Sequence, residues 1–253
     1  MILEPTEIYL TMKKYVHNIA FKALYYSGLA FIYRILFQRR RPTVLLFHEL
    51  DQAGASMAVD ALSTRYNIVS SDILVDCILA KSFFSLPDYP LILTFDDGRK
   101  SNLSINVFSK NDIPATNFIS SSNERLDGKK FISASEITDL SNNFSIESHA
   151  HSHPRMDELD LSQQMNEINQ NSAFIESVTG IRPLLFAYPY GKYNEDSVKA
   201  VKECGMKAAF TVDPGYVDIK DGPYKIKRIC VSNRPTKEEL IVKASGILTI
   251  LKR

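Results

Sequence analysis

Residues 91–98 read LILTFDDG, a short apolar run that ends abruptly in two carboxylates. Such a run suits a parallel strand that is buried on both faces. Two adjacent carboxylates are costly to bury without partners, so Asp96 and Asp97 either cap a helix or bind something cationic. This stretch therefore predicts a strand of an α/β sheet with a polar cluster at its carboxyl end.

Four further apolar runs follow the same pattern. They are residues 44–47 before His48, 144–146 before Glu147-Ser148-His149, 184–187 before Tyr188-Pro189-Tyr190, and 208–212 before Asp213. Segments with helix caps lie between them, at residues 72–80, from 133, at 161–178, at 194–204 and from 236 to 251. Because polar residues follow several strands, we expect one incomplete or distorted (β/α) barrel of about seven strands.

The composition excludes several classes of protein. The chain has 253 residues, of which 45% are hydrophobic, enough for one large core and too many for a disordered chain. Thirty basic and 29 acidic residues leave a net charge of +1, so we expect no nucleic-acid partner. The three cysteines form no C-x-x-C pair, which argues against a disulfide framework or a thiolate zinc site and favours a reducing compartment.

The first 42 residues differ from residues 43–253, which we take as the main domain. Residues 13–41 are rich in apolar and aromatic side chains, but Lys22 and Arg34 leave no charge-free run long enough to span a membrane. We expect an amphipathic helix on an inner membrane surface, with a helix packed on the domain itself as the open alternative. The segment ends in three arginines, and it shows no cleavage pattern for a signal peptidase. Both features favour a cytoplasmic location over export.

Three of the five histidines lie within residues 149–153. In a helical turn, His149 and His153 would converge on one metal ion, whereas in an extended segment His151 would join them on one face. Pro154 disfavours the helical conformation at His153, so both arrangements stay open. Next to this cluster, metal binding becomes the stronger interpretation of the two aspartates.

Three motifs in order resemble those of NodB-like polysaccharide deacetylases, carbohydrate esterase family four. They are TFDDG at 94–98, HAHSHP at 149–154 and FAYPYG at 186–191, and the likeness runs from about Thr43 to Val231. His48, after Leu-Leu-Phe, is similar to the first histidine of the circularly permuted branch that includes the poly-N-acetylglucosamine deacetylases.

The resemblance implies a metal-dependent hydrolase that removes the N-acetyl group from an N-acetylhexosamine glycan, at a carbon–nitrogen bond that is not a peptide. It implies that Asp97, His149 and His153 hold a divalent metal ion. Zinc is expected first, although cobalt, nickel or iron(II) also suits these ligands.

The resemblance also implies the catalytic roles. Asp96 would be the general base and His48 the general acid, the backbone N–H of Tyr190 would stabilise the oxyanion, and Asp213 would orient His48. Many members have an arginine where this chain has Ala187, and Arg228 is the substitute we consider for tethering the base. Ala150 replaces a Ser or Thr beside the first histidine ligand, which removes a hydroxyl near the site.

Two other interpretations remain open. One is a deformylase or deacetylase that acts on a lipid-linked sugar at the cytoplasmic membrane face, as the amphipathic N-terminus suggests. The other is a non-catalytic glycan-binding descendant, suggested by Ala150 and Ala187. The joint retention of a base, an acid and three ligands favours an enzyme.

Overall fold

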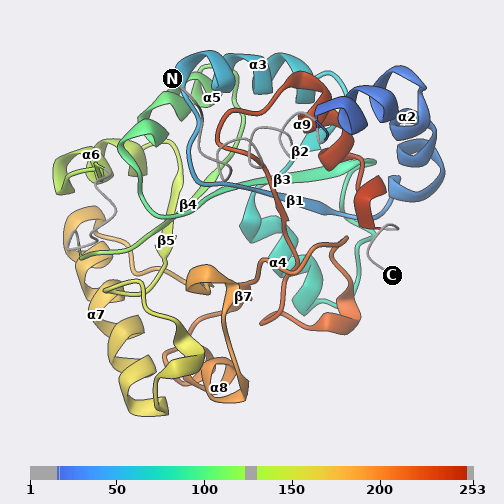
Figure 1. Cartoon of the computed structure of the whole chain (residues 1–253). Helices are drawn as coiled ribbons and strands as arrows, with labels where there is room; N and C mark the ends of the chain where they lie inside the picture. Colours follow the sequence, from blue (N-terminus) through green and yellow to red (C-terminus); the bar gives the residue numbers. More distant parts are fainter. Residues whose placement is uncertain (1–15, 17, 123–129, 250–253) are drawn as a thin grey trace, which may run out of the picture.

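The computed structural model describes residues 16, 18–122 and 130–249. Its centre is one parallel sheet with the strand order β7-β6-β5-β4-β3-β1-β8, and β2 pairs with β3 beside this path. Helices follow most strands and surround the curled sheet (Figure 1). The predicted incomplete barrel of about seven strands is confirmed.

The strands are short, and only the central ones have long apolar runs. Their bounds are β1 (Thr43–Phe47), β2 (Asn67–Ile68), β3 (Pro90–Phe95), β4 (Thr116–Ile119), β5 (Ser145–Ser148), β6 (Leu185–Ala187), β7 (Ala208–Phe210) and β8 (Ile229–Cys230). The run at 208–212 makes a shorter strand than expected, because beyond Phe210 the N–H of Thr211 bonds to the carbonyl of Ile226.

Alternate residues of the strands face two different cores. Val44 and Ile92 pack on the side of α4, whereas Leu45, Leu93 and Phe95 pack under the helices on the other side. This alternation follows from the two-residue period of a strand. Since both faces are buried, the strands read as continuous apolar runs.

The helices and helical turns have these bounds: α2 (Leu29–Tyr33), η1 (Arg34–Gln38), α3 (Gln52–Leu62), α4 (Ser71–Leu79), η2 (Lys100–Ile105), α5 (Asn106–Ser109), α6 (Ala134–Ser141), η3 (Met156–Glu158), α7 (Leu161–Thr179), η4 (Pro189–Gly191), α8 (Glu195–Glu203), η5 (Ile219–Asp221), α9 (Lys237–Ala244) and η6 (Ile247–Thr249). Capping boxes start α6, α7 and α8. The helix predicted over 161–178 is present as α7, and Gly180 directly after it adopts a left-handed φ of 74° that ends the helix.

The last helix is shorter than predicted. It ends at Ala244, and the chain turns at Gly246, whose φ is 71°. A Cβ at this position would lie 2.4 Å from the ring of Tyr216, so the turn needs glycine. The predicted end at Leu251 lies outside the described residues.

Residues 18–38 form a bent pair of helices, which we call the N-terminal lobe. Its two parts, Asn18–Tyr26 and Leu29–Gln38, meet at 68°. Among the described residues no single helix is long and apolar enough to cross a membrane, but this bent pair passes the same test of length and composition when its parts are joined. Residues 13–15 and 17 of the predicted amphipathic segment lie outside the described part.

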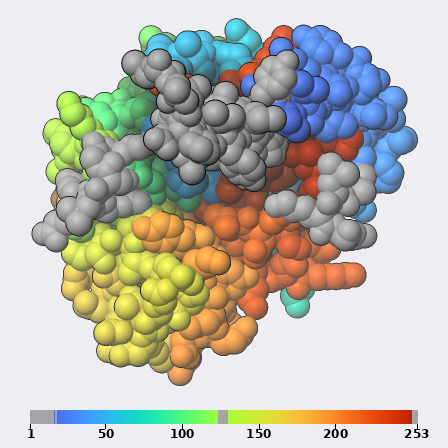
Figure 2. Space-filling model, viewed as in Figure 1, coloured from blue at the N-terminus to red at the C-terminus, as the bar shows by residue number. Residues whose placement is uncertain are grey.

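The N-terminal lobe is attached to the domain through few buried side chains. Phe21 and Ala30 pack against Val242 of α9, and the amide of Gln38 donates to the hydroxyl of Thr43 and the carbonyl of Ala244. The rest of the lobe forms the blue surface at the upper right of Figure 2. The alternative that the segment packs on its own domain is thus correct for these residues, while membrane contact stays a prediction.

Candidate active site

The carboxyl ends of the strands surround a cavity of about 560 Å³. Six of the seven predicted site residues line it, namely His48, Asp96, Asp97, His149, His153 and Tyr190. They come from segments that follow β1, β3, β5 and β6, so the fold joins residues that are far apart in the sequence. Parallel strands gather their carboxyl ends at one edge, where α/β sheets bind ligands.

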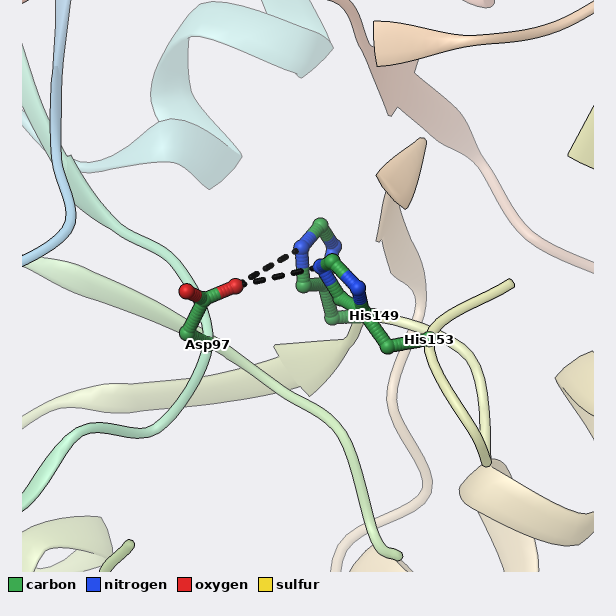
Figure 3. Close-up of side chains that lie close together, drawn as sticks. All are labelled: Asp97, His149 and His153. Atoms are coloured by element: carbon green, nitrogen blue, oxygen red, sulfur yellow. Dashed lines mark ion pairs between the residues drawn. The ribbon is translucent and has the colours of Figure 1, made fainter. Parts of the chain in front are cut away.

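Asp97, His149 and His153 form the most compact cluster in this cavity (Figure 3). Oδ1 of Asp97 lies 3.6 Å from Nε2 of His149 and 3.1 Å from Nε2 of His153. All three side chains are buried. Their potential ligand atoms lie within 4.8 Å of one another.

The backbone fixes the orientation of His149. Its Nδ1 lies 2.8 Å from the carbonyl oxygen of Ala187, which can only accept, so Nδ1 carries a proton and Nε2 is the ring nitrogen that faces Asp97. Residue 187 therefore contributes to the site through its backbone, which does not depend on its side chain. Sequence patterns give no signal for such a contact.

His151 points away from the cluster. Its Nδ1 lies 2.8 Å from the hydroxyl of Ser121, and it is not among the three grouped ligands. The segment is neither a helix nor a strand, because Ala150 and His153 have left-handed φ values of 62° and 59°. This conformation brings His149 and His153 together and settles the position of His151.

Left-handed backbone conformations are concentrated at the cavity. Of the seven non-glycine residues with positive φ in the described part of the chain, four lie at the site: Asp97, Ala150, His153 and Tyr190. Such conformations cost on the order of 1–3 kcal/mol each and persist where surrounding contacts enforce them. The site is thus held in its geometry by the fold.

Asp96 is held by the buried guanidinium of Arg228. Both carboxylate oxygens accept hydrogen bonds from it, at 2.7 Å each, and Nε of Arg228 donates to the carbonyl of Thr211. Burial opposes ionisation of Asp96, but Arg228 and, less strongly, His149 bring the pKa of Asp96 below its usual value. The contact that we considered between Arg228 and Asp96 is present.

Arg99 is a cavity residue that sequence reasoning missed. Its guanidinium lies 2.9 Å from Oδ2 of Asp97, while Oδ1 faces the two histidines. The two oxygens of Asp97 thus have different partners. The position of Arg99 directly after the TFDDG motif is the signal that could have found it. Ser152 and Val212 also line the cavity without having been predicted.

The remaining predicted residues are divided between the cavity and its surroundings. Tyr190 lies against His153, with ring centroids 4.5 Å apart. Asp213 does not line the cavity. Its Oδ2 accepts a hydrogen bond from Tyr193, and the structure does not bring it to His48.

The cluster fits a small divalent cation. Two ligands of tetrahedral zinc, each about 2.1 Å from the ion, lie about 3.4 Å apart. The distances of 3.1 and 3.6 Å from Asp97 to the two histidine nitrogens agree with this spacing. One carboxylate oxygen and two imidazole nitrogens also suit zinc, cobalt or nickel chemically.

Comparison with known proteins agrees with this geometry. Residues 85–209 match the family model for polysaccharide deacetylase. The chain is 27% identical over 145 residues to YxkH of Bacillus subtilis, whose name assigns it to the same family, covering 56% of this chain and 51% of that protein. It is 28% identical over 178 residues to the poly-beta-1,6-N-acetyl-D-glucosamine N-deacetylase of Staphylococcus epidermidis, covering 63% and 61%. The chain therefore spans about half to three fifths of the length of these relatives.

Two solved structures share the fold. The deacetylase PplD of Streptococcus pyogenes, in complex with acetate, superposes with a TM-score of 0.71 at 16% identity, covering 81% of this chain and 98% of that one. IcaB of Ammonifex degensii gives a TM-score of 0.70 at 19% identity, covering 81% and 97%. At these identities the likeness supports the architecture alone.

Proposed function

Because this chain belongs to the polysaccharide deacetylase family, we propose that it hydrolyses the N-acetyl amide of an N-acetylhexosamine glycan with a bound divalent metal. The observation that carries the proposal is that Asp96, which Arg228 pairs with from behind the cavity wall, lines the same cavity as the cluster of Asp97, His149 and His153. A base and a cation site side by side are what metal-assisted amide hydrolysis requires.

Asp97, His149 and His153 would hold the metal, with zinc as the expected ion. When bound, the ion would polarise the amide carbonyl and acidify water. Arg99 and the carbonyl of Ala187 would keep Asp97 and His149 in place.

Asp96 would take a proton from the attacking water at its carboxylate, which Arg228 keeps ionised and correctly oriented. The water oxygen would bond to the acetyl carbon while the carbonyl π electrons move onto the carbonyl oxygen, and the carbon–nitrogen bond would break when this carbonyl re-forms. His48 would donate a proton to the leaving nitrogen, and the N–H of Tyr190 would donate to the developing oxyanion. The products are acetate and a free amino sugar.

The test is acetate release from N-acetylglucosamine oligomers by the native chain and by Asp96→Asn, after chelation and re-addition of zinc or cobalt. Loss of a general base should lower the rate by about 10²–10⁴-fold while metal affinity stays near that of the native chain. Asp139→Asn, on the exposed face of α6, is the matched control. Metal binding without acetate release would contradict the substrate class, and absence of metal binding would contradict the mechanism.

A lipid-linked N-acyl sugar at the cytoplasmic membrane face is the second candidate substrate, because the N-terminal lobe exposes many apolar side chains. Acyl release from a polyprenyl-linked sugar, measured against free oligomers, separates the two substrates. The cytoplasmic location itself stays a prediction.

A further inference from the structure

The N-terminal lobe and its flanks carry most of the exposed large apolar side chains that the structure describes. Nine of the fifteen lie between Val16 and Phe37, and Phe31 and Leu36 are 59% and 66% exposed. Exposed apolar groups of this density mark interaction surfaces in soluble domains. The buried contacts of Phe21, Ala30 and Gln38 account only for the opposite face of the lobe.

The charged side chains of the N-terminal lobe and its flanks are all basic. Residues 16–41 include five basic residues and no acidic residue. Arg34, which interrupts the apolar run in the sequence, faces the domain: its guanidinium lies 3.8 Å from the ring centroid of Tyr89 and donates to the carbonyl of Arg65. The outward face is therefore apolar, with Lys22, Arg39 and Arg40 exposed beside it.

A further exposed aromatic residue lies close to this surface, outside the lobe. Phe84, in the loop before β3, is 89% exposed. Arg40 donates to the carbonyl of Leu86 in the same loop, and both Arg39 and Arg40 pair with Asp88. The loop and the end of the lobe thus form one continuous region.

This region lies at the end of the sheet opposite the cavity. The lobe contacts Thr43, the first residue of β1, and Arg65, which precedes β2. His48, which lines the cavity, follows the last residue of β1. A five-residue strand is about 17 Å long, so the lobe and the cavity are separated by the height of the sheet. Figure 1 shows α2 beside the start of β1.

We propose that the N-terminal lobe, with the loop around Phe84, binds the surface of an anionic lipid bilayer and holds the cavity facing away from it. Apolar side chains would enter the level of the acyl chains while the flanking basic residues meet anionic headgroups. The charge of the surface favours anionic lipid over a second copy, which would bring the exposed Lys22, Arg39, Arg40 and Arg41 of two chains against each other.

This orientation has a consequence that rests on the proposed function. A cavity that faces away from the bilayer would receive a glycan polymer more readily than a sugar held at the headgroups. Vesicle binding does not depend on catalysis, so the two proposals can fail separately.

The chain contains no tryptophan, so a single introduced indole is a clean fluorescent probe. Phe31→Trp reports the lobe, and Asn233→Trp reports the exposed segment after β8 at the cavity end. Ile181→Trp is the matched control, because Ile181 is 68% exposed and precedes β6, four strands away from β1 in the sheet.

The full chain is mixed with vesicles of phosphatidylcholine and phosphatidylglycerol in equal parts, or of phosphatidylcholine alone. We expect a blue shift and quenching by brominated lipid for Phe31→Trp with the anionic vesicles, and neither change for the other two probes. Equal quenching of Asn233→Trp would overturn the orientation. If Phe31→Trp shows no spectral shift and the protein does not sediment with the vesicles, the binding proposal is overturned.

Two charge variants test the same surface without a probe. Phe31→Glu with Leu36→Glu should weaken co-sedimentation with anionic vesicles by about tenfold or more, a factor that corresponds to about 1.4 kcal/mol. Lys22→Gln should weaken it about fivefold, whereas Lys199→Gln on α8 should not. If these variants instead abolish a dimer that forms without lipid, the surface is an interface between two copies and the proposal is wrong.

Discussion

The two ends of the sheet are built on opposite principles. At the carboxyl ends of the strands, charged side chains such as Asp96 and Asp97 are buried and paired, and the backbone of Asp97 is held in a left-handed conformation. At the amino ends, apolar side chains such as Phe31 are exposed and the attachment depends on a few contacts. The cavity end is thus preorganised, because its own contacts hold the side chains in place without a ligand. At the lobe end, apolar surface stays exposed that no other part of the described chain covers.

The largest effect is expected at the cavity end. Arg228→Met leaves the carboxylate of Asp96 buried without its partner, which should destabilise the chain by about 3–5 kcal/mol. Urea unfolding measures the loss. Arg182→Met removes an exposed pair with Glu176 and should cost about 1 kcal/mol or less. Similar losses in both variants would show that the pair with Asp96 is not a special feature of this end.

The next effect is expected at the lobe. Phe21→Ala removes the main buried contact with α9, so the free energy of local opening of residues 18–38 should fall by about 3 kcal/mol. Hydrogen exchange measures this opening directly. Metal affinity at the cavity should stay unchanged, and a parallel loss of metal binding would show that the two ends are coupled.

A buried carboxyl between the two ends should give a smaller effect. Burial raises the pKa of Glu147 to about 7, although Ser145 and the N–H groups of Leu184 and Leu185 donate to it. Between about pH 4.5 and 7 the folded state therefore binds more protons than the unfolded state, and stability falls as the pH rises. The slope is at most about 1.4 kcal/mol per pH unit.

Glu147→Gln keeps an oxygen that can accept from the two N–H groups, and it cannot titrate. The pH-dependent fall in thermal stability should therefore be smaller in this variant, as measured by melting curves across that range. Glu176→Gln, at an exposed position of α7, serves as the control. An unchanged slope in Glu147→Gln would assign the pH dependence to other groups.

The smallest effect is expected on the outer face of the lobe. Phe31→Ser should change the free energy of unfolding by about 0.5 kcal/mol or less, because the ring contributes little to the buried core. Urea unfolding in lipid-free buffer measures it. A large loss would mean that Phe31 packs against its own chain in solution, which would contradict the contrast between the two ends.

The fold was largely predictable because the central strands are buried on both faces. Residues 44–47 and 91–95 therefore read as uninterrupted apolar runs. The two-residue strands β2 and β8 were missed, since two residues carry no period. The length of the last helix was wrong because Gly246 turns the chain, and the close approach of Tyr216 to this glycine is a tertiary contact.

The grouping of the site residues was predictable from motif order, whereas their individual contacts were not. Asp97, His149 and His153 converge as the resemblance implied, but the separate orientation of His151 follows from left-handed backbone at Ala150 and His153. The predicted role of Asp213 depended on a loose match, and the structure pairs this residue with Tyr193. Arg99 was missed although it directly follows the TFDDG motif, because its pairing with Asp97 is a side-chain contact that the motif itself does not specify.

The position of Arg228 has a consequence for the order of folding. It precedes β8, which pairs with β1, so the pairing joins segments that are almost the whole described chain apart. Contacts of such long sequence separation form slowly, because a large loop must close before they are made. Asp96 acquires its counter-ion only when this late segment docks. In a newly made chain, the pairing of β8 with β1 and the pairing of Arg228 with Asp96 would therefore form in the same step. A chain stalled before residue 228 would contain all three sequence motifs, but its Asp96 would lack the arginine partner.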